Sequence, residues 1–281
     1  MMETEKIQEI EINLLLEALF LRYGYDFRHY DRAAIRRRIL HCLESCTFAH
    51  ISEIVPHLLY QGTFLTRLVH ALSVNTTEMF RDPESFAALR TRVLPTLATY
   101  PFINIWHAGC ATGEEVYSLA ILLHEADLLN HARIYATDID DEVLAKARDG
   151  VYHLDRLAPF ADNYRQAGGH GSLGEYLTTG HGLFRMHDWL RDNMVFSNHN
   201  LVTDGVFAEI HLLMCRNVLI YFDATLQRRA LRLFHDSLTR GGFLCLGGSE
   251  SLHFSDVADH FLPIAQQERI YRKSLTPESR T

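Results

Sequence analysis

The sequence WHAGCATGEEVYSLA, residues 106–120, directly follows the short apolar run FINIW at Phe102–Trp106. An apolar strand that enters a glycine-bearing turn and leaves it as a helix is the arrangement of a nucleotide pocket. Such pockets usually receive phosphate at the start of the helix, yet here Glu114 and Glu115 occupy that place. The stretch therefore predicts an α/β fold with a ligand site, and its two carboxylates restrict which ligand can bind.

The glycine turn departs from the dinucleotide fingerprint G-x-G-x-x-G. The middle glycine, which lets pyrophosphate approach, is missing between Gly109 and Gly113. Glu114 and Glu115 would repel phosphate, although the helix dipole by itself also favours acidic residues there. Two interpretations stay open: the glutamates only stabilise the helix start, or the ligand is a nucleoside that lacks phosphates and carries a cationic group. S-adenosylmethionine, with adenosine, a sulfonium and an α-ammonium, fits the second interpretation.

The next predicted strand supports a nucleoside site. The segment RIYATDID, residues 133–140, places Asp138 near the strand end, 25 residues after Gly113. An acidic residue at the tip of the second strand can accept hydrogen bonds from ribose hydroxyls. Many strands end in aspartate, so the signal is the order of strand, glycine turn, helix, strand and aspartate. That order does not separate methyl transfer from other chemistry.

Beyond residue 100 the pattern alternates between strand-like and helix-like segments. This alternation predicts a mostly parallel sheet with helices on both faces. The segment Tyr152–Asn193 interrupts it with six glycines and no long helix, so we interpret it as an inserted small β-structure. The predicted strands are Phe102–Trp106, Arg133–Ile139, Met194–Ser197, Ile210–Cys215, Gly242–Leu246 and Arg269–Lys273, and the predicted helices are Gly113–Leu129, Asp140–Arg148 and Ala224–Thr239.

The N-terminal quarter of the chain has the apolar spacing of helices. The segment IQEIEINLLLEALFLRYG ends at Gly24, which is a helix C-cap candidate. The polar, proline-containing segment SVNTTEMFRDPESF (73–86) predicts a linker. We therefore divide the chain into residues 1–73, 74–100 and 101–281. Further helices are predicted at Arg32–Glu44, Ile51–Tyr60, Gly62–Leu72 and Glu84–Thr99.

Composition limits the class of protein. The 281 residues are 47% hydrophobic, enough for one large or two modest domains. No apolar run approaches 18 residues, and the polar N-terminus MMETEKIQEI is unlike a signal peptide. The five cysteines form no C-x-x-C motif, which favours reduced thiols in the cytoplasm. The 17 histidines are scattered without zinc spacing, so we expect no metal.

The net charge of −8 conceals a basic segment. Arg22–Leu40 contains six arginines and two aspartates and carries +4, so the remainder carries −12. A basic patch on an acidic protein favours a local acidic partner. If RHYDRAAIRRRI is one helix, Arg28, Arg32 and Arg36 share a face at spacings of four residues, and Arg38 lies on a different part of the surface. A solvated face without a partner is the alternative.

Several stretches together resemble the chemotaxis-receptor glutamate methyltransferases, the CheR family. The resemblance covers about residues 10–273 and implies a Rossmann-like, S-adenosylmethionine-dependent methyltransferase domain. It also implies a small inserted β-subdomain at 152–193 and an all-α N-terminal receptor-recognition domain. The stretches are NTTEMFRDPESF (75–86), WHAGCATGEEVYSLA (106–120), YATDIDDEVLAKARDGVY (135–152) and CRNVLIYFD (215–223), with FSNHNL (196–201) and LGGSESL (246–252) adding to the match.

The resemblance implies roles for particular residues. Tyr221 corresponds to a tyrosine close to the transferred methyl group, and we expect Arg81 and Tyr221 to orient the reacting groups. Three positions depart from the family pattern: His107 replaces a small serine, Val116 a proline, and His211 an aspartate. The positions that match cofactor-binding residues are Asn75, Thr77, Arg81, Gly109, Glu115, Asp138, Asn200, Leu201, Arg216 and Asn217.

The implied reaction transfers a methyl group from S-adenosylmethionine to glutamate side chains of chemoreceptors and forms methyl esters. A glutamate carboxylate, with a pKa near ~4.3, is already ionised at neutral pH, so the reaction needs no general base. The receptors present these glutamates on a cytoplasmic helical bundle, with which Arg28, Arg32 and Arg36 would pair. We expect a cytoplasmic monomer that is recruited to membrane receptor arrays without inserting into the membrane or binding nucleic acid.

Other functions would share parts of this pattern. A nucleic-acid methyltransferase typically carries an Asn/Asp-Pro-Pro-aromatic motif where this chain has CRNVLIYF. A catalytically silent receptor-binding module would not need the intact cofactor residues, and an NAD-dependent enzyme would need the full glycine fingerprint. Within the insertion, the turn TTGHG at Thr178–Gly182 is short. We therefore expect that this subdomain does not bind a receptor C-terminal peptide by strand addition.

Overall fold

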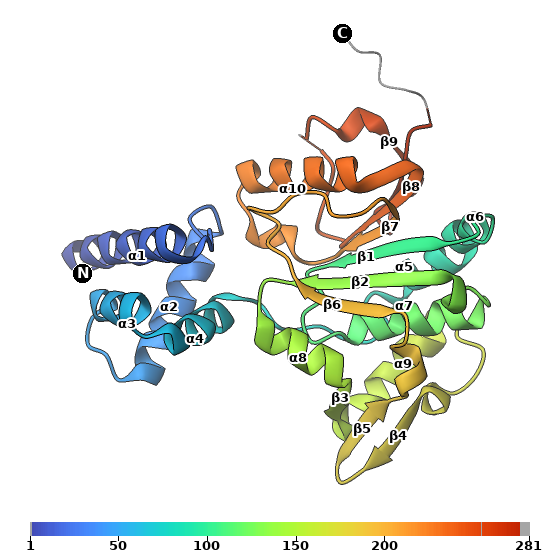
Figure 1. The fold of residues 1–281 in the computed structure, drawn as a ribbon, viewed down its shortest axis with the longest axis horizontal. Helices are drawn as coiled ribbons and strands as arrows, with labels where there is room; N and C mark the ends of the chain where they lie inside the picture. The colour runs from blue at the N-terminus through green and yellow to red at the C-terminus, as the bar shows by residue number, and fades with distance from the viewer. Residues whose placement is uncertain (1, 254, 276–281) are drawn as a thin grey trace.

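The computed structural model describes residues 2–253 and 255–275, and it consists of a helical N-terminal part joined to an α/β part (Figure 1). The first part contains α1 (Met2–Tyr23), α2 (Arg32–Cys46), α3 (Ile54–Tyr60) and α4 (Gly62–Leu72). No helix in the described ranges is long and apolar enough to cross a membrane.

Local signals set the ends of two of these helices, and the cap at Gly24 was predicted from the sequence. Gly24 adopts a φ of 78° after α1, and its N–H donates to the carbonyl of Phe20, which is the left-handed C-cap that glycine favours. Asp31 caps α2, because its side chain accepts a hydrogen bond from the N–H of Ala34. Apolar side chains from all four helices, such as Leu15, Ile39 and others, form a separate small core.

The connection to the second part is a short extended segment followed by a bent helix. The predicted helix at Glu84–Thr99 is present as α5 (Pro83–Ala88), a π-helical turn at Leu89–Val93, and α6 (Leu94–Leu97). Pro83 lies in the first turn, where its missing N–H costs no hydrogen bond.

The second part is built on a sheet of seven strands in the order β6-β2-β1-β7-β8-β10-β9. The first five strands in this order are parallel to one another, as predicted, whereas β10 is antiparallel to both β8 and β9. The strands are β1 (Ile103–Ala108), β2 (Ala132–Asp138), β6 (Met194–Asn198), β7 (Ile210–Cys215), β8 (Leu238–Leu246), β9 (Phe261–Ala265) and β10 (Ile270–Lys273).

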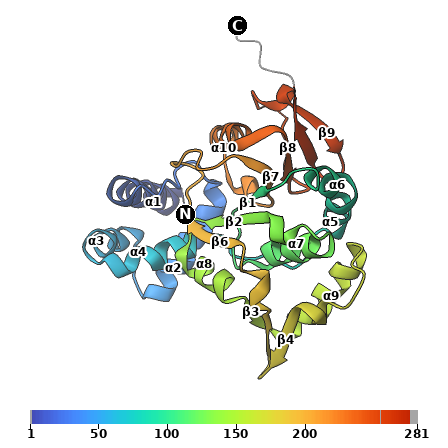
Figure 2. The ribbon, with the colours of Figure 1, turned by 45° about the vertical axis from the view of Figure 1, so that its right-hand side comes forward.

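Helices cover both faces of this sheet (Figure 2). Helices α7 (Glu114–Glu125) and α8 (Asp141–Asp149) lie on one face together with α5 and α6, and α10 (Ala224–Ser237) lies on the other. Successive strand residues point to opposite faces, so Ile105 of β1 joins the core under α7 whereas Trp106 joins the core under α10. A parallel sheet that is buried on both faces explains the continuous apolar runs.

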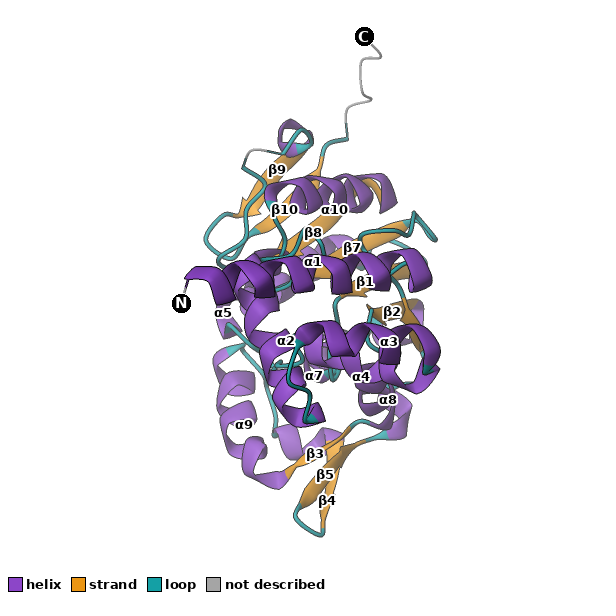
Figure 3. Cartoon of the chain, turned by 90° about the vertical axis from the view of Figure 1, so that its left-hand side faces the viewer, coloured by secondary structure: helices purple, strands orange, loops and turns teal. Residues whose placement is uncertain are grey.

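The insertion contains the small β-structure that was predicted, and it also contains a helix that was not predicted. It contains α9 (Leu157–Gln166) beside a three-stranded antiparallel sheet of β3 (Val151–His153), β5 (Leu183–Met186) and β4 (Leu177–Gly180) (Figure 3). Helix α9 buries Phe160 and Tyr164, which are four residues apart. Leu157 and Ala161 extend this apolar side at helical spacing, but a helix of ten residues is marginal by itself, so tertiary packing stabilises it.

Strand β9 was also missed. Its sequence FLPIA contains Pro263, which has no N–H to donate and therefore reads as a poor strand residue. The strand lies at the edge of the sheet, with β10 as its single neighbouring strand in the described part of the chain. Among the described residues, the backbone N–H groups on its outer side therefore have no strand to pair with. An edge position is the place where a sheet tolerates proline.

One carboxylate of α7 anchors the insertion to the main domain. Glu125 accepts hydrogen bonds from the hydroxyls of Tyr164 and Tyr176 and pairs with Arg90 at 2.5 Å. Its side chain is 8% exposed. Removing it would leave a cation and two hydroxyls without their shared acceptor, which is costly in a buried site.

We expect Glu125→Ala to lower the free energy of unfolding by about 2–4 kcal/mol, because it leaves these buried groups unpaired. Thermal unfolding measures the change, and hydrogen exchange should rise within residues 157–190. Asp162→Ala is the control: it breaks the exposed Asp162–Arg165 pair on α9, which is worth less than ~1 kcal/mol. Equal effects of the two variants would contradict an anchoring role.

Candidate functional site

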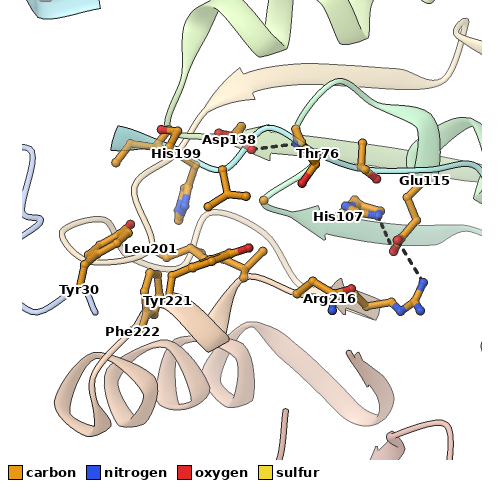
Figure 4. A pocket seen from close by; sticks show the side chains of 18 of the residues that line it. Tyr30, Thr76, His107, Glu115, Asp138, His199, Leu201, Arg216, Tyr221 and Phe222 are labelled. Carbon is orange, nitrogen blue, oxygen red and sulfur yellow. Dashed lines mark hydrogen bonds and ion pairs between the residues drawn. The ribbon is translucent and has the colours of Figure 1, made fainter. Parts of the chain in front are cut away.

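The pocket lies where the carboxyl ends of β1, β2, β6 and β7 face the helical N-terminal part (Figure 4). The space within it is about 870 Å³, a figure that includes volume open to solvent. The linker at 73–81 forms another wall. Of the predicted cofactor and catalytic positions, the pocket brings together Thr77, Arg81, Gly109, Glu115, Asp138, Asn200, Leu201, Arg216, Asn217 and Tyr221.

The glycine turn shapes one wall of the pocket, and its glycines serve close packing. Gly109 has a φ of 73°, and a Cβ there would lie 2.4 Å from Cγ2 of Val218. The loops after β1 and β7 therefore touch at a point where only glycine fits. Gly113 has a φ of 89°, and a Cβ there would meet Ala147 at 2.8 Å. Gly113 faces α8 and does not line the pocket.

The two glutamates after this turn point in different directions. Glu115 lines the pocket, and its carboxylate lies 3.0 Å from Nη1 of Arg216 and 3.2 Å from Nε2 of His107 (Figure 4). Burial alone would raise the pKa of Glu115, but the charge of Arg216 and the hydrogen bond with His107 outweigh it and lower the pKa. Glu115 therefore presents an ionised carboxylate at this end of the pocket.

Glu114 lies outside the pocket, so the expectation that it also faces a ligand is wrong. Its carboxylate pairs with Nη1 of Arg156 at 2.7 Å and accepts a hydrogen bond from the Thr112 hydroxyl at 2.6 Å. Burial raises its pKa. Nη2 of Arg156 donates to the carbonyl of Thr77 at 2.6 Å. Glu114 thus links α7 to the insertion, and Arg156 holds the linker against the pocket.

Asp138 stands at the end of β2, as predicted. Its Oδ2 accepts a hydrogen bond from the N–H of Ala111 at 2.9 Å, and its Oδ1 accepts one from the N–H of Asp140 at 3.1 Å. Burial raises the pKa of Asp138 to about 6 despite these bonds. Leu201 and the ring of His199 line the pocket near this carboxylate. This end of the pocket offers an acceptor beside apolar and ring surfaces.

Asn75, a predicted cofactor-binding position, does not line this pocket but borders a separate hollow together with Thr77 and Arg81. Its amide donates to Oδ2 of Asp140 at 3.3 Å and lies 3.2 Å from Nδ1 of His70. Nδ1 of His70 is itself 2.7 Å from Oδ2 of Asp140. Asn75 therefore helps to join the end of α4 to the start of α8. The match to the family motif could not distinguish a residue that joins two helices from a residue that contacts a ligand.

Arg38 was placed on another part of the surface by helical spacing, and the structure corrects this. Its guanidinium carbon lies 5.3 Å from the centre of the Tyr221 ring, and it donates to the carbonyl of Leu72. Burial lowers its pKa.

Arg81 also lines the pocket, and in the described part of the chain its side chain has no ion pair. Arg38 therefore contacts Tyr221 directly, and Arg81 is a second cation in the lining of the same pocket.

Arg28, Arg32 and Arg36 do not form the single helical face that the sequence predicted. Helix α2 begins at Arg32, so Arg28 lies before it and pairs with Asp26 and Glu17. Arg32 pairs with Glu9, and Arg36 donates to Gln8, both on α1. These side chains are one-third exposed or partly buried, and part of their charge is neutralised within the domain. The i, i+4, i+8 argument failed because the Asp31 cap starts the helix after Arg28.

His107 and His211, two of the positions that depart from the family pattern, lie in different parts of the structure. His107 lies in the pocket wall and contacts Glu115. His211 lies at the start of β7, where its Nδ1 accepts a hydrogen bond from the N–H of Asn104 at 3.0 Å. Burial lowers the pKa of His211. Within the described ranges, no group of three or more His, Cys, Asp or Glu side chains is arranged to hold a metal ion.

Glu250 is a site residue for which the sequence analysis proposed no role. Its carboxylate, 4% exposed, accepts four backbone hydrogen bonds of 2.6–3.1 Å. The donors are the N–H groups of Gly247, Asn217, Val218 and Leu219. Asn217 has a φ of 60°, a conformation that non-glycine residues rarely adopt. Glu250 therefore fixes the turn after β7 that carries pocket residues.

We expect Glu250→Gln to destabilise the protein by about 2–4 kcal/mol, because the amide NH2 would face backbone donors in a buried site. Ligand affinity should fall with it, since Asn217 and Val218 line the pocket. Thermal unfolding and calorimetry with S-adenosylhomocysteine measure both effects. Glu209→Gln, at the exposed far end of β7, is the control. Wild-type stability and affinity in Glu250→Gln would refute the clamp.

Comparisons with known proteins agree with this architecture. Residues 75–270 match the CheR methyltransferase SAM-binding domain, and residues 10–73 match the CheR methyltransferase all-alpha domain. A Pseudomonas putida protein named as the methyltransferase Cher3 is 48% identical over 273 residues, which cover 97% of this chain and 100% of that protein. Chemotaxis protein methyltransferases of Listeria monocytogenes and Escherichia coli are 31% and 29% identical, covering 82% and 89% of this chain and 85% and 87% of theirs. The chain belongs to the CheR methyltransferase family, and most of the residues that line the pocket lie within its match to the S-adenosylmethionine-binding domain of that family.

Proposed function

We propose that this methyltransferase transfers the methyl group of S-adenosylmethionine to glutamate carboxylates of chemoreceptors and so forms methyl esters. Three relatives support the pathway, since they are named chemotaxis protein methyltransferases in Listeria monocytogenes, Escherichia coli and Salmonella typhimurium. The observation that carries the substrate class is that one pocket is lined by Arg38, which contacts the Tyr221 ring, and by Arg81. Two cations that line one pocket favour an anionic acceptor.

The donor and acceptor groups of the pocket fit S-adenosylmethionine. Asp138 offers a carboxylate for ribose hydroxyls, and Leu201 with His199 offers a surface for the base. Glu115 and Arg216 form a buried pair of opposite charge, which suits the zwitterionic methionine end. Asn75 is left out of this assignment because it contacts α8.

The chain's residues orient the acceptor and exclude water. When bound, S-adenosylmethionine supplies an electrophilic methyl group on a sulfonium. A glutamate acceptor is ionised at neutral pH and needs no base, so the residues around Tyr221 have only to hold one carboxylate oxygen in line with the methyl group. We assign this role to Arg38, which contacts the Tyr221 ring, and to Arg81, which lines the same pocket and has no ion pair within the described residues. The Tyr221 ring lies beside Tyr30 and Phe222 at one end of the pocket (Figure 4).

The helical N-terminal domain is proposed to bind the helical bundle of the receptor. Arg32 and Arg36 remain partly available on α2, although they also contact α1. Arg28 contributes less, because Asp26 and Glu17 already pair with it. We further propose that the enzyme is a cytoplasmic monomer that finds membrane receptor arrays through this domain.

The insertion is proposed to work without a receptor tail peptide. Strands β4 and β5 are joined by the two-residue turn His181–Gly182, with φ values of 53° and 75°. Both residues have positive φ, as a tight two-residue hairpin turn requires. Titration of a receptor C-terminal peptide by calorimetry tests this, and low-micromolar affinity would contradict it.

We expect methyl-labelled S-adenosylmethionine to label receptor cytoplasmic fragments in a form that mild alkali releases as methanol, because glutamate esters are base-labile. Arg38→Ala and Arg81→Ala should each lower turnover by about tenfold or more, since each removes a charge-assisted contact to the acceptor carboxylate. Arg37→Ala, an exposed neighbour on α2 outside the pocket, is the control for turnover.

Other results would redirect the assignment. Label in nucleic acid would indicate a nucleic-acid methyltransferase. Absence of both transfer and S-adenosylmethionine binding would indicate a silent receptor-binding module. Alkali-stable label on receptor protein would contradict an ester and therefore the glutamate acceptor.

A pH dependence should follow from Asp138. Its pKa is raised to about 6, so the carboxylate is ionised at pH 7.5 and mostly protonated at pH 5. Ribose hydroxyls donate to the ionised form, so affinity for S-adenosylhomocysteine should fall as the pH decreases through about 6. Calorimetry at several pH values measures this. In Asp138→Asn the affinity should be lower and should lose most of the change near pH 6; an unchanged pH profile would contradict the assignment.

A further inference from the structure

The helical domain and the catalytic domain are joined by backbone hydrogen bonds at Tyr221. Tyr30 and Phe222 form an antiparallel bridge between segments that are far apart in the chain. The N–H of Asp31 donates to the carbonyl of Tyr221 at 2.8 Å, and the N–H of Asp223 donates to the carbonyl of His29 at 2.8 Å. The segment before α2 thus pairs with the segment that carries the catalytic tyrosine.

Both helices that flank this bridge begin at it. Asp31 caps α2, and Asp223 caps α10 by accepting from the N–H groups of Thr225 and Leu226. Nδ1 of His29 also lies 2.9 Å from Oδ2 of Asp223. The bridge is therefore rigidly connected to one helix from each domain.

Side chains pack around the same bridge. The ring of Tyr30 lies 4.9 Å from the ring of Phe222 and 4.7 Å from that of Phe27, measured between ring centres. Figure 4 shows Tyr30, Phe222 and Tyr221 together at one end of the pocket. Arg38 adds a contact to the Tyr221 ring itself. Tyr221 is thus held from the helical domain at both its carbonyl and its ring.

We propose that the helical N-terminal domain positions Tyr221 for catalysis through the Asp31–Tyr221 hydrogen bond, in addition to any role in receptor binding. This inference rests on the proposed function, because the role of Tyr221 is tied to methyl transfer. Asp31 is a positioning residue that acts through its backbone N–H, and it does not contact the substrate. Since α2 also carries Arg38, a receptor helix that binds α2 contacts the element that aligns Tyr221.

The backbone geometry allows a test that removes this single hydrogen bond. Asp31 has a φ of −51° and a ψ of 117°, and proline adopts a similar φ without an N–H. Asp31→Pro loses both the side-chain cap and the N–H, whereas Asp31→Ala loses only the cap. The difference between these two variants therefore reports the hydrogen bond to Tyr221.

A second pair of variants probes the other half of the bridge. Asp223 has a φ of −71°, and the preceding Phe222 has a ψ of 145°, which is the conformation that a residue before proline favours. Asp223→Pro removes the N–H donated to His29, and Asp223→Ala retains it. Both variants lose the cap of α10, so their comparison again isolates one hydrogen bond. This pair keeps the proposal testable if Asp31→Pro does not fold.

The experiment compares the full-length variants in methylation of a receptor cytoplasmic fragment and in hydrogen exchange. We expect kcat of Asp31→Pro to be about threefold to tenfold below that of Asp31→Ala, with the receptor KM of the two within about twofold. A general loss of folding would not produce this split. Exchange in the peptide spanning 217–226 should be faster in the proline variant of each pair.

Equal kcat and equal exchange within both pairs would overturn the proposal. A lower kcat with unchanged exchange would also count against it, because the hydrogen bond would then not be what orders the segment. If the wild-type protein methylates no receptor fragment, the proposed function fails. The exchange comparison still decides in that case whether the helical domain orders the Tyr221 segment.

Discussion

Arg216 makes the interactions on which the geometry of the pocket depends. It stands after β7 with its guanidinium buried, 3.0 Å from Glu115 on α7 and 2.8 Å from Asp82 in the linker. It also donates to the carbonyl of Arg81 at 2.9 Å. An unpaired buried guanidinium would cost several kcal/mol, so its partners have to be in place together. This requirement brings the glycine-turn helix, the linker and the end of β7 into one wall.

The segment that follows Arg216 is held from three directions. Glu250 accepts its backbone N–H groups from the side of β8, and the amide of Gln227 donates to the carbonyls of Leu219 and Phe222 from α10. The helical N-terminal domain supplies the third constraint through Asp31. The loop therefore has hydrogen-bond partners on three separate parts of the fold, which restrict its conformation. Pre-ordering of the pocket is what alignment-dependent catalysis requires.

The cases in which local pattern was insufficient share one cause. Glu114 and Glu115 are adjacent and chemically identical, and only the positions of Arg156 and Arg216 decide which one reaches the pocket. Arg38 was separated from the site by its helical spacing, although the opposite domain packs against that face. Spacing along a helix states which residues share a face, but it does not state what lies opposite that face.

The sequence by itself determined the alternation of strands and helices, the glycine turn, the acidic end of β2 and the family motifs, because these depend on local periodicity and on short runs of residues. Among the pocket residues, Glu115 and Asp138 follow from these local patterns, whereas Arg216 and Tyr221 were implied only by the family resemblance. The tertiary structure alone decided that Asn75 faces α8, that α9 forms, and that Glu250 and Asp31 hold the turn after β7. The physical reason is that these features rest on hydrogen bonds and packing between segments tens to nearly two hundred residues apart, as in the pairing of His29 with Asp223. No local pattern encodes such partners.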